Sequence, residues 1–360
     1  MASAVNSYSA SDRLLHNSAF KSWSLMTSLS GIESRIYKKS LCRIEITKPV
    51  FVTALPRAGT TLLLELCVET REFASHTYRD MPFLLTPLFW DRFSGMFKRS
   101  DVAKERAHGD GMMISVDSPE AFEEIIWKGY WPSRYLRDRI VPWTEPDFPE
   151  FEDFFRDHMR KIIMLRGRDA SRQHRYISKN NLNIARIGYI KKVFPDSIIV
   201  VPFRAPLQHA SSMLRQHRNF TKIHEQDPFS SKYMQDIGHF DFGENLRPVD
   251  FDGWVSSEQT SDPDTLLFWV RYWIKAYRYL LSNATDHAHF FPYDDFCESP
   301  GDKLRDLGEL LEINDIDSLM RQADRITAPQ PYDIDVGSIP SDILHQAETL
   351  FEELLSLPLR

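Results

Sequence analysis

The sequence predicts an α/β protein with a doubly wound, mostly parallel sheet and helical insertions. Two short runs, residues 49–55 (PVFVTAL) and 197–203 (SIIVVPF), are rich in β-branched residues and apolar on both faces, which is typical of buried parallel strands. Each run is followed by a helix signal, a leucine-rich stretch from Leu62 and a proline at position 206. Strands that alternate with helices in this way predict a sheet with helices on both sides.

The other elements are expected from periodicity and capping residues. Strands are expected at 175–178 and 289–293, and helices at 181–194, 264–282, 300–312 and 341–356. A further helix is expected to begin at Asp117, because Pro119 would lie in its first turn and Glu120 completes a capping-box spacing. Residues 221–262 are polar and rich in Asp, Gly and Pro, and are expected to form a long loop.

The expected domain organisation is simple. Residues 1–45 are interpreted as an N-terminal helical lead-in, and residues 46–360 as a single domain with insertions at about 80–155 and 221–262. No internal repeat and no clear linker divides the chain.

Composition excludes several classes of protein. The 360 residues are 42% hydrophobic and 26% charged, which is ordinary for a globular protein, and the net charge of −7 disfavours general nucleic-acid binding. The three cysteines include no CxxC pair, which fits a reducing compartment and provides no metal-site spacing. The N-terminus lacks a secretory signal, and no apolar run reaches the roughly 18 residues of a membrane span. A cytoplasmic protein is therefore expected.

Basic residues are nevertheless concentrated in one segment. Residues 156–192 contain eleven Lys or Arg and only two acidic residues. This run could hold a polyanionic ligand, or it could form a basic surface that binds an acidic partner.

The segment from the first strand to the first helix is a candidate anion site. Its loop, PRAGTT, places the backbone N–H groups and the positive end of a helix near Gly59, with Arg57, Thr60 and Thr61 as further donors. It is not the ATP-type loop, which has the pattern G-x-x-x-x-G-K-[ST]. Here a single glycine is present and the basic residue precedes it, so a different transferred group is indicated.

Two motifs together carry a family resemblance. PRAGTTLL resembles the 5′-phosphosulfate loop of bacterial-type sulfotransferases that use 3′-phosphoadenosine 5′-phosphosulfate (PAPS), with the pattern P-R-x-G-T-T. Arg204 ends the strand SIIVVPF and Ser212 follows eight positions later, which is similar to the R-x7-S element that binds the 3′-phosphate in that family. Weaker matches are Tyr293-Asp294-Asp295-Phe296 and the step Lys179-Asn180.

The resemblance covers about residues 49–312 and implies a sheet of the P-loop-like sulfotransferase type. It implies transfer of a sulfuryl group from PAPS to an acceptor hydroxyl, which leaves 3′-phosphoadenosine 5′-phosphate, with no metal required. The donor-binding residues that it implies are Arg57, Ala58, Gly59, Thr60, Thr61, Leu62, Arg204 and Ser212. Arg57 and Lys179 would stabilise charge on the transferred group. The glycine-rich C-terminal segment of cytosolic aryl sulfotransferases is absent, which disfavours small phenols and steroids as acceptors.

A hydroxyl acceptor also needs a general base. In families with this loop an acidic residue about twenty positions on often has that role, so Asp80 is the first candidate and His76 the second. Glu120, with Glu123 and Glu124 on one helical face, is a further candidate, although such acidic stripes are usually solvated.

The acceptor itself is left open, with a carbohydrate as one class. Trp127, Tyr130, Trp131 and Tyr135 could stack on sugar rings or pack in the core. The alternatives are a P-loop kinase of a small molecule, which would need a lysine after the glycine, and a carbohydrate-binding protein without turnover. A homo-oligomer is also left open.

Overall fold

A five-stranded sheet forms the centre of the computed structural model, which describes residues 10–94, 104–105, 113–115, 117–144, 147–167, 174–257 and 262–358. The strand order is β2-β5-β1-β6-β7, and every neighbouring pair is parallel. The strands are β1 (Val50–Val52), β2 (Phe73–Ala74), β5 (Arg175–Lys179), β6 (Ile198–Phe203) and β7 (His289–Pro292). A separate antiparallel pair is formed by β3 (Lys104–Glu105) and β4 (Met113–Ile114).

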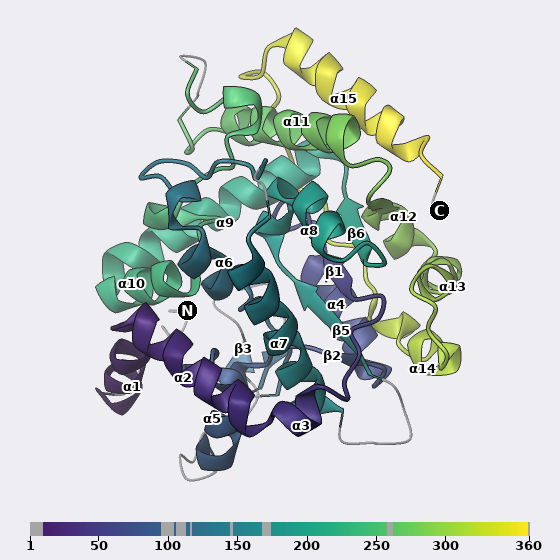
Figure 1. Ribbon diagram of the computed structural model, residues 1–360. Helices are drawn as coiled ribbons and strands as arrows, with labels where there is room; N and C mark the ends of the chain where they lie inside the picture. Colours follow the sequence, from purple (N-terminus) through teal and green to yellow (C-terminus); the bar gives the residue numbers. More distant parts are fainter. Residues whose placement is uncertain are drawn as a thin grey trace.

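Helices cover both faces of this sheet. One face carries α4 (Thr60–Glu69), α12 (Tyr293–Glu298), α13 (Pro300–Leu310) and α14 (Ile316–Met320), and the other carries α7 (Pro149–Arg166), α8 (Ile187–Val193), α9 (Pro206–Gln226), α11 (Leu266–Asn283) and α15 (Ser341–Leu355). In Figure 1, α13 and α14 lie on one side of the strands, and α7 and α9 lie on the other. The predicted doubly wound α/β fold is confirmed.

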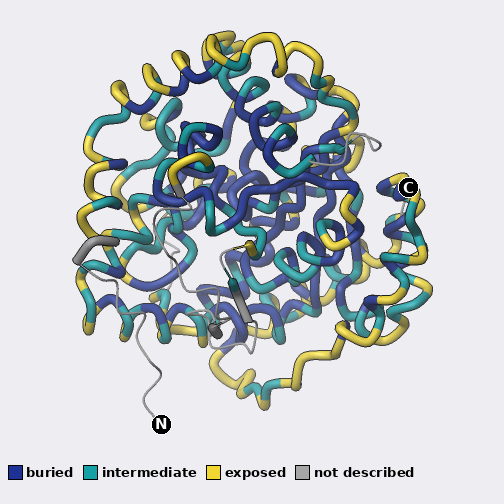
Figure 2. The backbone as a smooth tube through the Cα atoms, turned by 90° about the horizontal axis from the view of Figure 1, so that it is seen from below, coloured by how far each residue is buried: buried dark blue, intermediate teal, exposed yellow. Residues whose placement is uncertain are grey.

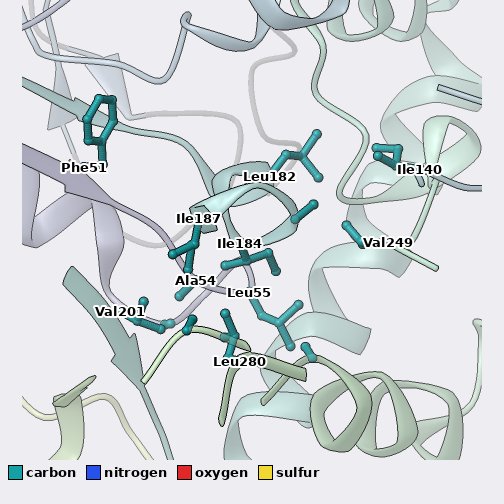
Figure 3. Close-up of a cluster of buried hydrophobic side chains, with 14 of the residues drawn as sticks. Phe51, Ala54, Leu55, Ile140, Leu182, Ile184, Ile187, Val201, Val249 and Leu280 are labelled. Atoms are coloured by element: carbon teal, nitrogen blue, oxygen red, sulfur yellow. The ribbon is translucent and has the colours of Figure 1, made fainter. Parts of the chain in front are cut away.

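The two faces form two separate hydrophobic cores. Successive side chains of a strand point to opposite faces, so Val50 and Val52 pack with α4 while Phe51 packs with Ile187 and Val201 on the other side. Figure 3 shows part of this second core, with Phe51, Ile187 and Val201 labelled. Figure 2 shows that buried residues fill the centre of the molecule and exposed ones its periphery.

Strand register brings three connections to one edge of the sheet. Val52 of β1 is aligned with Lys179 of β5 and with Val200 of β6. The carboxyl ends of these parallel strands therefore meet, and the segments that begin near Thr53, Asn180 and Arg204 lie side by side. Ligands of open α/β sheets bind at this edge.

The prediction that a helix begins at Asp117 is wrong. α6 spans Glu124–Tyr130, and Asp117 instead forms an ion pair with Arg79, with Nε and Oδ1 2.7 Å apart. Pro119 forms an antiparallel bridge with Thr77. The backbone of this segment is held by a distant part of the chain, and that tertiary contact overrides the local capping signal.

The long loop predicted for 221–262 is wrong over residues 221–237, whereas residues 238–257 are irregular apart from two 3-10 turns and one bridge. α9 continues to Gln226, and α10 (Pro228–Ile237) follows, because the Asp227 side chain accepts a hydrogen bond from the Phe229 N–H and Pro228 occupies the first turn. The helix predicted at 181–194 is divided into a 3-10 turn, Asn181–Ala185, and α8.

The N-terminal segment forms α1 (Ala10–Phe20), α2 (Trp23–Ile36) and α3 (Lys38–Leu41), and α5 (Pro87–Ser94) lies at the same end of the molecule (Figure 1). Across the described ranges, no helix is both long enough and apolar enough to cross a membrane.

Candidate active site

The loop between β1 and α4 has an unusual backbone. Arg57 and Gly59 have φ angles of 74° and 92°, and Gly59 is the residue that caps the N-terminus of α4. A Cβ on Gly59 would lie 2.1 Å from Cε2 of Tyr293. Glycine is therefore required here by conformation and by space, and the turn directs the first N–H groups of α4 to the carboxyl edge of the sheet.

The element after β6 lies against this loop. Arg204 donates from Nη1 to the Arg57 carbonyl oxygen at 3.1 Å, and Arg57 Nε lies 3.4 Å from the Oγ of Ser212 on α9. Two segments that are 147 positions apart in the sequence are thus brought together at one edge of the sheet. The roles of these three residues in binding a donor stay predictions.

Arg204 is a buried cation that is incompletely paired. Its residue is 7% exposed, and its Nε has no hydrogen-bond partner within the described structure. Asp294 Oδ1 lies 3.6 Å from that Nε, while the other oxygen of Asp294 accepts from the Ala205 N–H at 2.6 Å. A buried guanidinium without full hydrogen bonding is costly, so this position favours an additional anion.

His209 supports the loop from the helix side. Its Nε2 donates to the Pro56 carbonyl oxygen at 2.9 Å. Burial, with Arg204 second, lowers the pKa of His209 to about 3, so the ring is neutral. Sequence reasoning missed this residue, although it lies on the helix opened by Pro206, between Arg204 and Ser212.

A C-terminal segment closes over the same helix. The backbone N–H and carbonyl of Tyr332 bond the amide of Gln208, at 2.8 and 3.0 Å, and the Tyr332 hydroxyl lies 3.5 Å from Ser212 Oγ. The guanidinium of Arg215 lies 4.9 Å from the centre of the Tyr332 ring. Residues 208, 212 and 215 are four and three positions apart, so they lie on one face of the helix. This spacing is the sequence signal that could have predicted the contact.

A second polar group adjoins the loop through Asn181. The Asn181 Oδ1 accepts from Thr60 Oγ1 at 3.4 Å, and its Nδ2 donates to Asp241 Oδ2 at 3.0 Å. His239 Nε2 lies 3.7 Å from the same Asp241 oxygen. The chain of contacts therefore runs from α4 to the segment after α10, which sequence reasoning took for a loop.

The pKa of His239 responds to burial and to three charged groups. Its pKa is lowered, with burial as the main cause; Asp241 and Glu120 act to raise the pKa, and Lys179 acts to lower it. His239 and Asp241 adjoin the loop through Asn181, and we call these three residues, with Lys179 and Glu120, the acceptor wall.

The acidic residues 123 and 124 are not a solvated stripe. Glu124 pairs with the buried Arg186 and accepts from Asn180 Nδ2 at 2.7 Å. The Arg186 guanidinium lies 4.0 Å from the Trp127 ring centre. The solvated interpretation is therefore wrong, and Trp127 and Trp131 belong to the hydrophobic core rather than to a sugar platform.

Asp80 and His76, the sequence candidates for a base, have other partners. Asp80 Oδ1 lies 2.5 Å from Arg166 Nη2, and its Oδ2 accepts from the Thr77 N–H at 2.8 Å. His76 and His158 face each other through their Nε2 atoms at 2.8 Å, and burial lowers the pKa of His76 to about 3. Both base assignments stay predictions.

No group of three or more His, Cys, Asp or Glu side chains in the described part of the chain is arranged to hold a metal ion.

Comparison with known proteins identifies the family. The family described as "Sulfotransferase family" matches residues 49–317, most of the chain, so the protein belongs to the sulfotransferase family. A crystal structure of a sulfotransferase from Mycobacterium avium is 14% identical, with 92% of this chain and 82% of that chain covered and a TM-score of 0.52. The sulfotransferase domain of a Synechococcus olefin synthase is 13% identical, covering 86% and 96%, with a TM-score of 0.36.

The Mycobacterium avium likeness, together with the parallel sheet, confirms the fold as the P-loop-like sulfotransferase type. No curated protein matches the chain.

Proposed function

We propose that this sulfotransferase uses PAPS as its donor and transfers the sulfuryl group to an acceptor hydroxyl. The observation that carries the proposal is Arg204, a buried and incompletely hydrogen-bonded cation beside Arg57 and Ser212. PAPS carries two anionic groups on one nucleotide, the 3′-phosphate and the 5′-phosphosulfate. Two adjoining basic elements at one sheet edge suit such a ligand better than a single phosphate chain.

The two ends of the donor are assigned to the two elements. Arg204 and Ser212 would bind the 3′-phosphate, since a guanidinium matches phosphate oxygens with two parallel hydrogen bonds. The backbone N–H groups of residues 58–62, with the hydroxyls of Thr60 and Thr61, would bind the 5′-phosphosulfate. Arg57 would stabilise the negative charge that develops on the leaving side during transfer.

The acceptor hydroxyl is assigned to the acceptor wall. An in-line transfer needs the nucleophile opposite the leaving oxygen, and Asn181 connects the wall directly to Thr60 of the loop. Lys179, at the end of β5, would supply the second positive charge. No metal is needed in this scheme, because the cations and N–H groups of the chain balance the charge.

For the general base we propose Asp241, with Asp80 and His76 as the alternatives from the sequence. Asp241 accepts a hydrogen bond from Asn181, the residue that contacts the loop. Both oxygens of Asp80, in contrast, are held by Arg166 and Thr77. Loss of the Asp80 carboxylate would remove a buried ion pair, so its effect on stability separates the two assignments.

We further propose that the acceptor is a hydroxyl-bearing metabolite such as a carbohydrate, and that the protein acts in the cytoplasm. Whether it forms a homo-oligomer is tested in the next subsection.

The direct experiment uses PAPS labelled in its sulfur and fractions of a cell extract as acceptors, in the presence of EDTA. We expect label in one class of hydroxyl compound with the parent protein and labelling about 10²- to 10³-fold slower with Arg57→Ala, while the exposed Arg305→Ala serves as the matched control. Transfer that needs ATP and Mg²⁺ instead of PAPS would support the kinase alternative and overturn the proposal.

A further inference from the structure

The amphipathic pattern of α2 is inverted. Its buried face holds Met26, Ser30 and Glu33, while Leu25, Leu29, Ile32 and Ile36 are 57%, 36%, 46% and 65% exposed. A surface helix of a globular protein ordinarily turns its apolar stripe to the core and its charged residues to water. Here a serine and a glutamate face inward and four Leu or Ile side chains, spaced four, three and four residues apart, face outward.

The inward face is fixed by a buried ionic cluster. Lys161 of α7 lies 3.0 Å from Glu33 Oε2 and donates to the Ser30 carbonyl and hydroxyl oxygens at 3.0 and 2.8 Å. The Phe89 N–H of α5 donates to the other Glu33 oxygen at 2.6 Å. Rotation of α2 to bury its leucines would separate this pair and leave Lys161 buried alone, which is strongly unfavourable. The apolar stripe is therefore held outward.

Neighbouring elements add exposed apolar side chains at the same end of the molecule. Leu14 of α1 is 69% exposed and Phe93 of α5 is 54% exposed. Of the eight large hydrophobic side chains that are exposed in the described residues, six belong to α1, α2 and α5. Figure 1 shows these three helices together at one end of the protein. Scattered single exposures are ordinary, but such clustering indicates a binding surface.

The N-terminal helices carry a net charge opposite in sign to that of the whole chain. The first 43 residues contain six basic and two acidic residues, a net charge of +4, on a chain of net charge −7. All six basic residues are exposed, whereas Glu33, one of the two acids, is buried in the cluster with Lys161. The six are Arg13, Lys21, Arg35, Lys38, Lys39 and Arg43.

We infer that α1, α2 and α5 form a docking surface for a lipid bilayer with anionic headgroups. The stripe of α2 would enter the boundary between headgroups and acyl chains, and the flanking lysines and arginines would meet the lipid phosphates. A second copy of the chain fits less well, although the spacing of the stripe also suits a helix pair. It would bring together two surfaces that each carry net positive charge. The inference does not depend on the proposed donor.

The test is co-sedimentation of the full chain with vesicles of phosphatidylcholine, with and without phosphatidylglycerol. We expect binding to the anionic vesicles that weakens with added salt, and much weaker binding to phosphatidylcholine alone. The double variant Leu29→Ser, Ile32→Ser should lower the partition coefficient at least about tenfold. Lys38→Gln, Lys39→Gln should lower only the anionic component, by about fivefold per lysine.

The matched control is Val336→Ser, Leu355→Ser, which removes exposed apolar side chains elsewhere and should bind vesicles like the parent. All substituted residues are exposed, and circular dichroism and thermal melting verify that each variant is folded. Absence of binding to either vesicle would overturn the inference, as would full binding by the Leu29→Ser, Ile32→Ser variant. A dimer in light scattering that this variant disrupts, without vesicle binding, would assign the surface to a second copy instead.

Discussion

Arg57, Arg204 and Ser212 form what we call the phosphate wall, which consists of two turns, each directly after a parallel strand and before a helix, and of one position on the helix α9. The acceptor wall is assembled differently, from the end of β5, the turn after it, the segment after α10 and the approach to α6. In the phosphate wall the backbone conformation itself directs N–H groups of α4 to the sheet edge. In the acceptor wall, side chains from distant segments must meet. In the proposed function the phosphate wall would bind the donor and the acceptor wall would bind the acceptor.

The comparison predicts that substitutions in the two walls fail in different steps. Changes in the phosphate wall should weaken the donor complex at Arg204, or the stabilisation of its leaving side at Arg57, whatever the acceptor. Changes in the acceptor wall should leave donor affinity nearly unchanged and lower kcat.

The largest effect is expected at Asp241. Asp241→Asn keeps the size of the side chain and an oxygen near Asn181 but loses the proton acceptor, so kcat should fall about 10²- to 10⁴-fold. Affinity for 3′-phosphoadenosine 5′-phosphate, measured by calorimetry, should be unchanged. Asp80→Asn is the comparison, and we expect it mainly to lower the melting temperature through its lost pair with Arg166. A normal melting temperature with a low kcat in Asp80→Asn would make Asp80 the base.

The next effect is expected at Arg57. Arg57→Ala removes the permanent charge of the loop, and loss of one group that stabilises developing charge typically lowers kcat about 10²- to 10³-fold. Steady-state kinetics with labelled PAPS gives the measurement. Equal kcat in Arg57→Ala and the parent would show that the backbone N–H groups alone stabilise the leaving side.

A smaller effect, on binding, is expected at Arg204. Arg204→Ala removes a charge-assisted phosphate contact, worth on the order of 1.5–3 kcal/mol, so the dissociation constant of the bisphosphate should rise roughly ten- to hundred-fold. Arg218→Ala, an exposed arginine on the same helix as Ser212, should bind like the parent. Unchanged affinity in Arg204→Ala would remove the basis of the donor assignment.

The smallest effect is a pH dependence at His209. Its folded pKa of about 3 lies below the ordinary 6.5, so the unfolded state binds a proton that the folded state refuses, and stability falls as pH drops below 6.5. Between pH 6.5 and about pH 5, one such imidazole lowers the free energy of unfolding by about 2 kcal/mol. His209→Gln keeps an amide donor for Pro56, and its free energy of unfolding should lose that much less on acidification. Identical denaturant midpoints for the parent and His209→Gln at every pH in this range would contradict the lowered pKa of His209.

The two walls also differ in how much the sequence predicts. The positions of Arg57, Gly59 and Arg204 at turns after buried strands were predictable, because strand, turn and helix are contiguous in the sequence. Their roles in binding stay predictions. The places of His239 and Asp241 were not predictable, because their approach to Asn181 depends on α10, whose Asp227–Pro228 start lay inside an apparent loop. No local signal reports such long-range contacts.

The basic run at 156–192 shows the same limit. Lys161 pairs with Glu33, Arg166 with Asp80 and Arg186 with Glu124, all partners distant in the sequence. Arg168 and Arg172 lie outside the described residues. A concentration of charge in the sequence therefore partly reflects internal ion pairs, which only the fold reveals.

The central claim, that the phosphate wall binds a 3′,5′-bisphosphorylated nucleotide, is tested most directly by calorimetry of the parent protein. Titrations with 3′-phosphoadenosine 5′-phosphate and with ATP, both in EDTA, compare the two ligands at the same site. The account predicts that the bisphosphate binds much more tightly, because Arg204 and Ser212 contact a 3′-phosphate that ATP lacks. ATP binding that equals or exceeds that of the bisphosphate would contradict it.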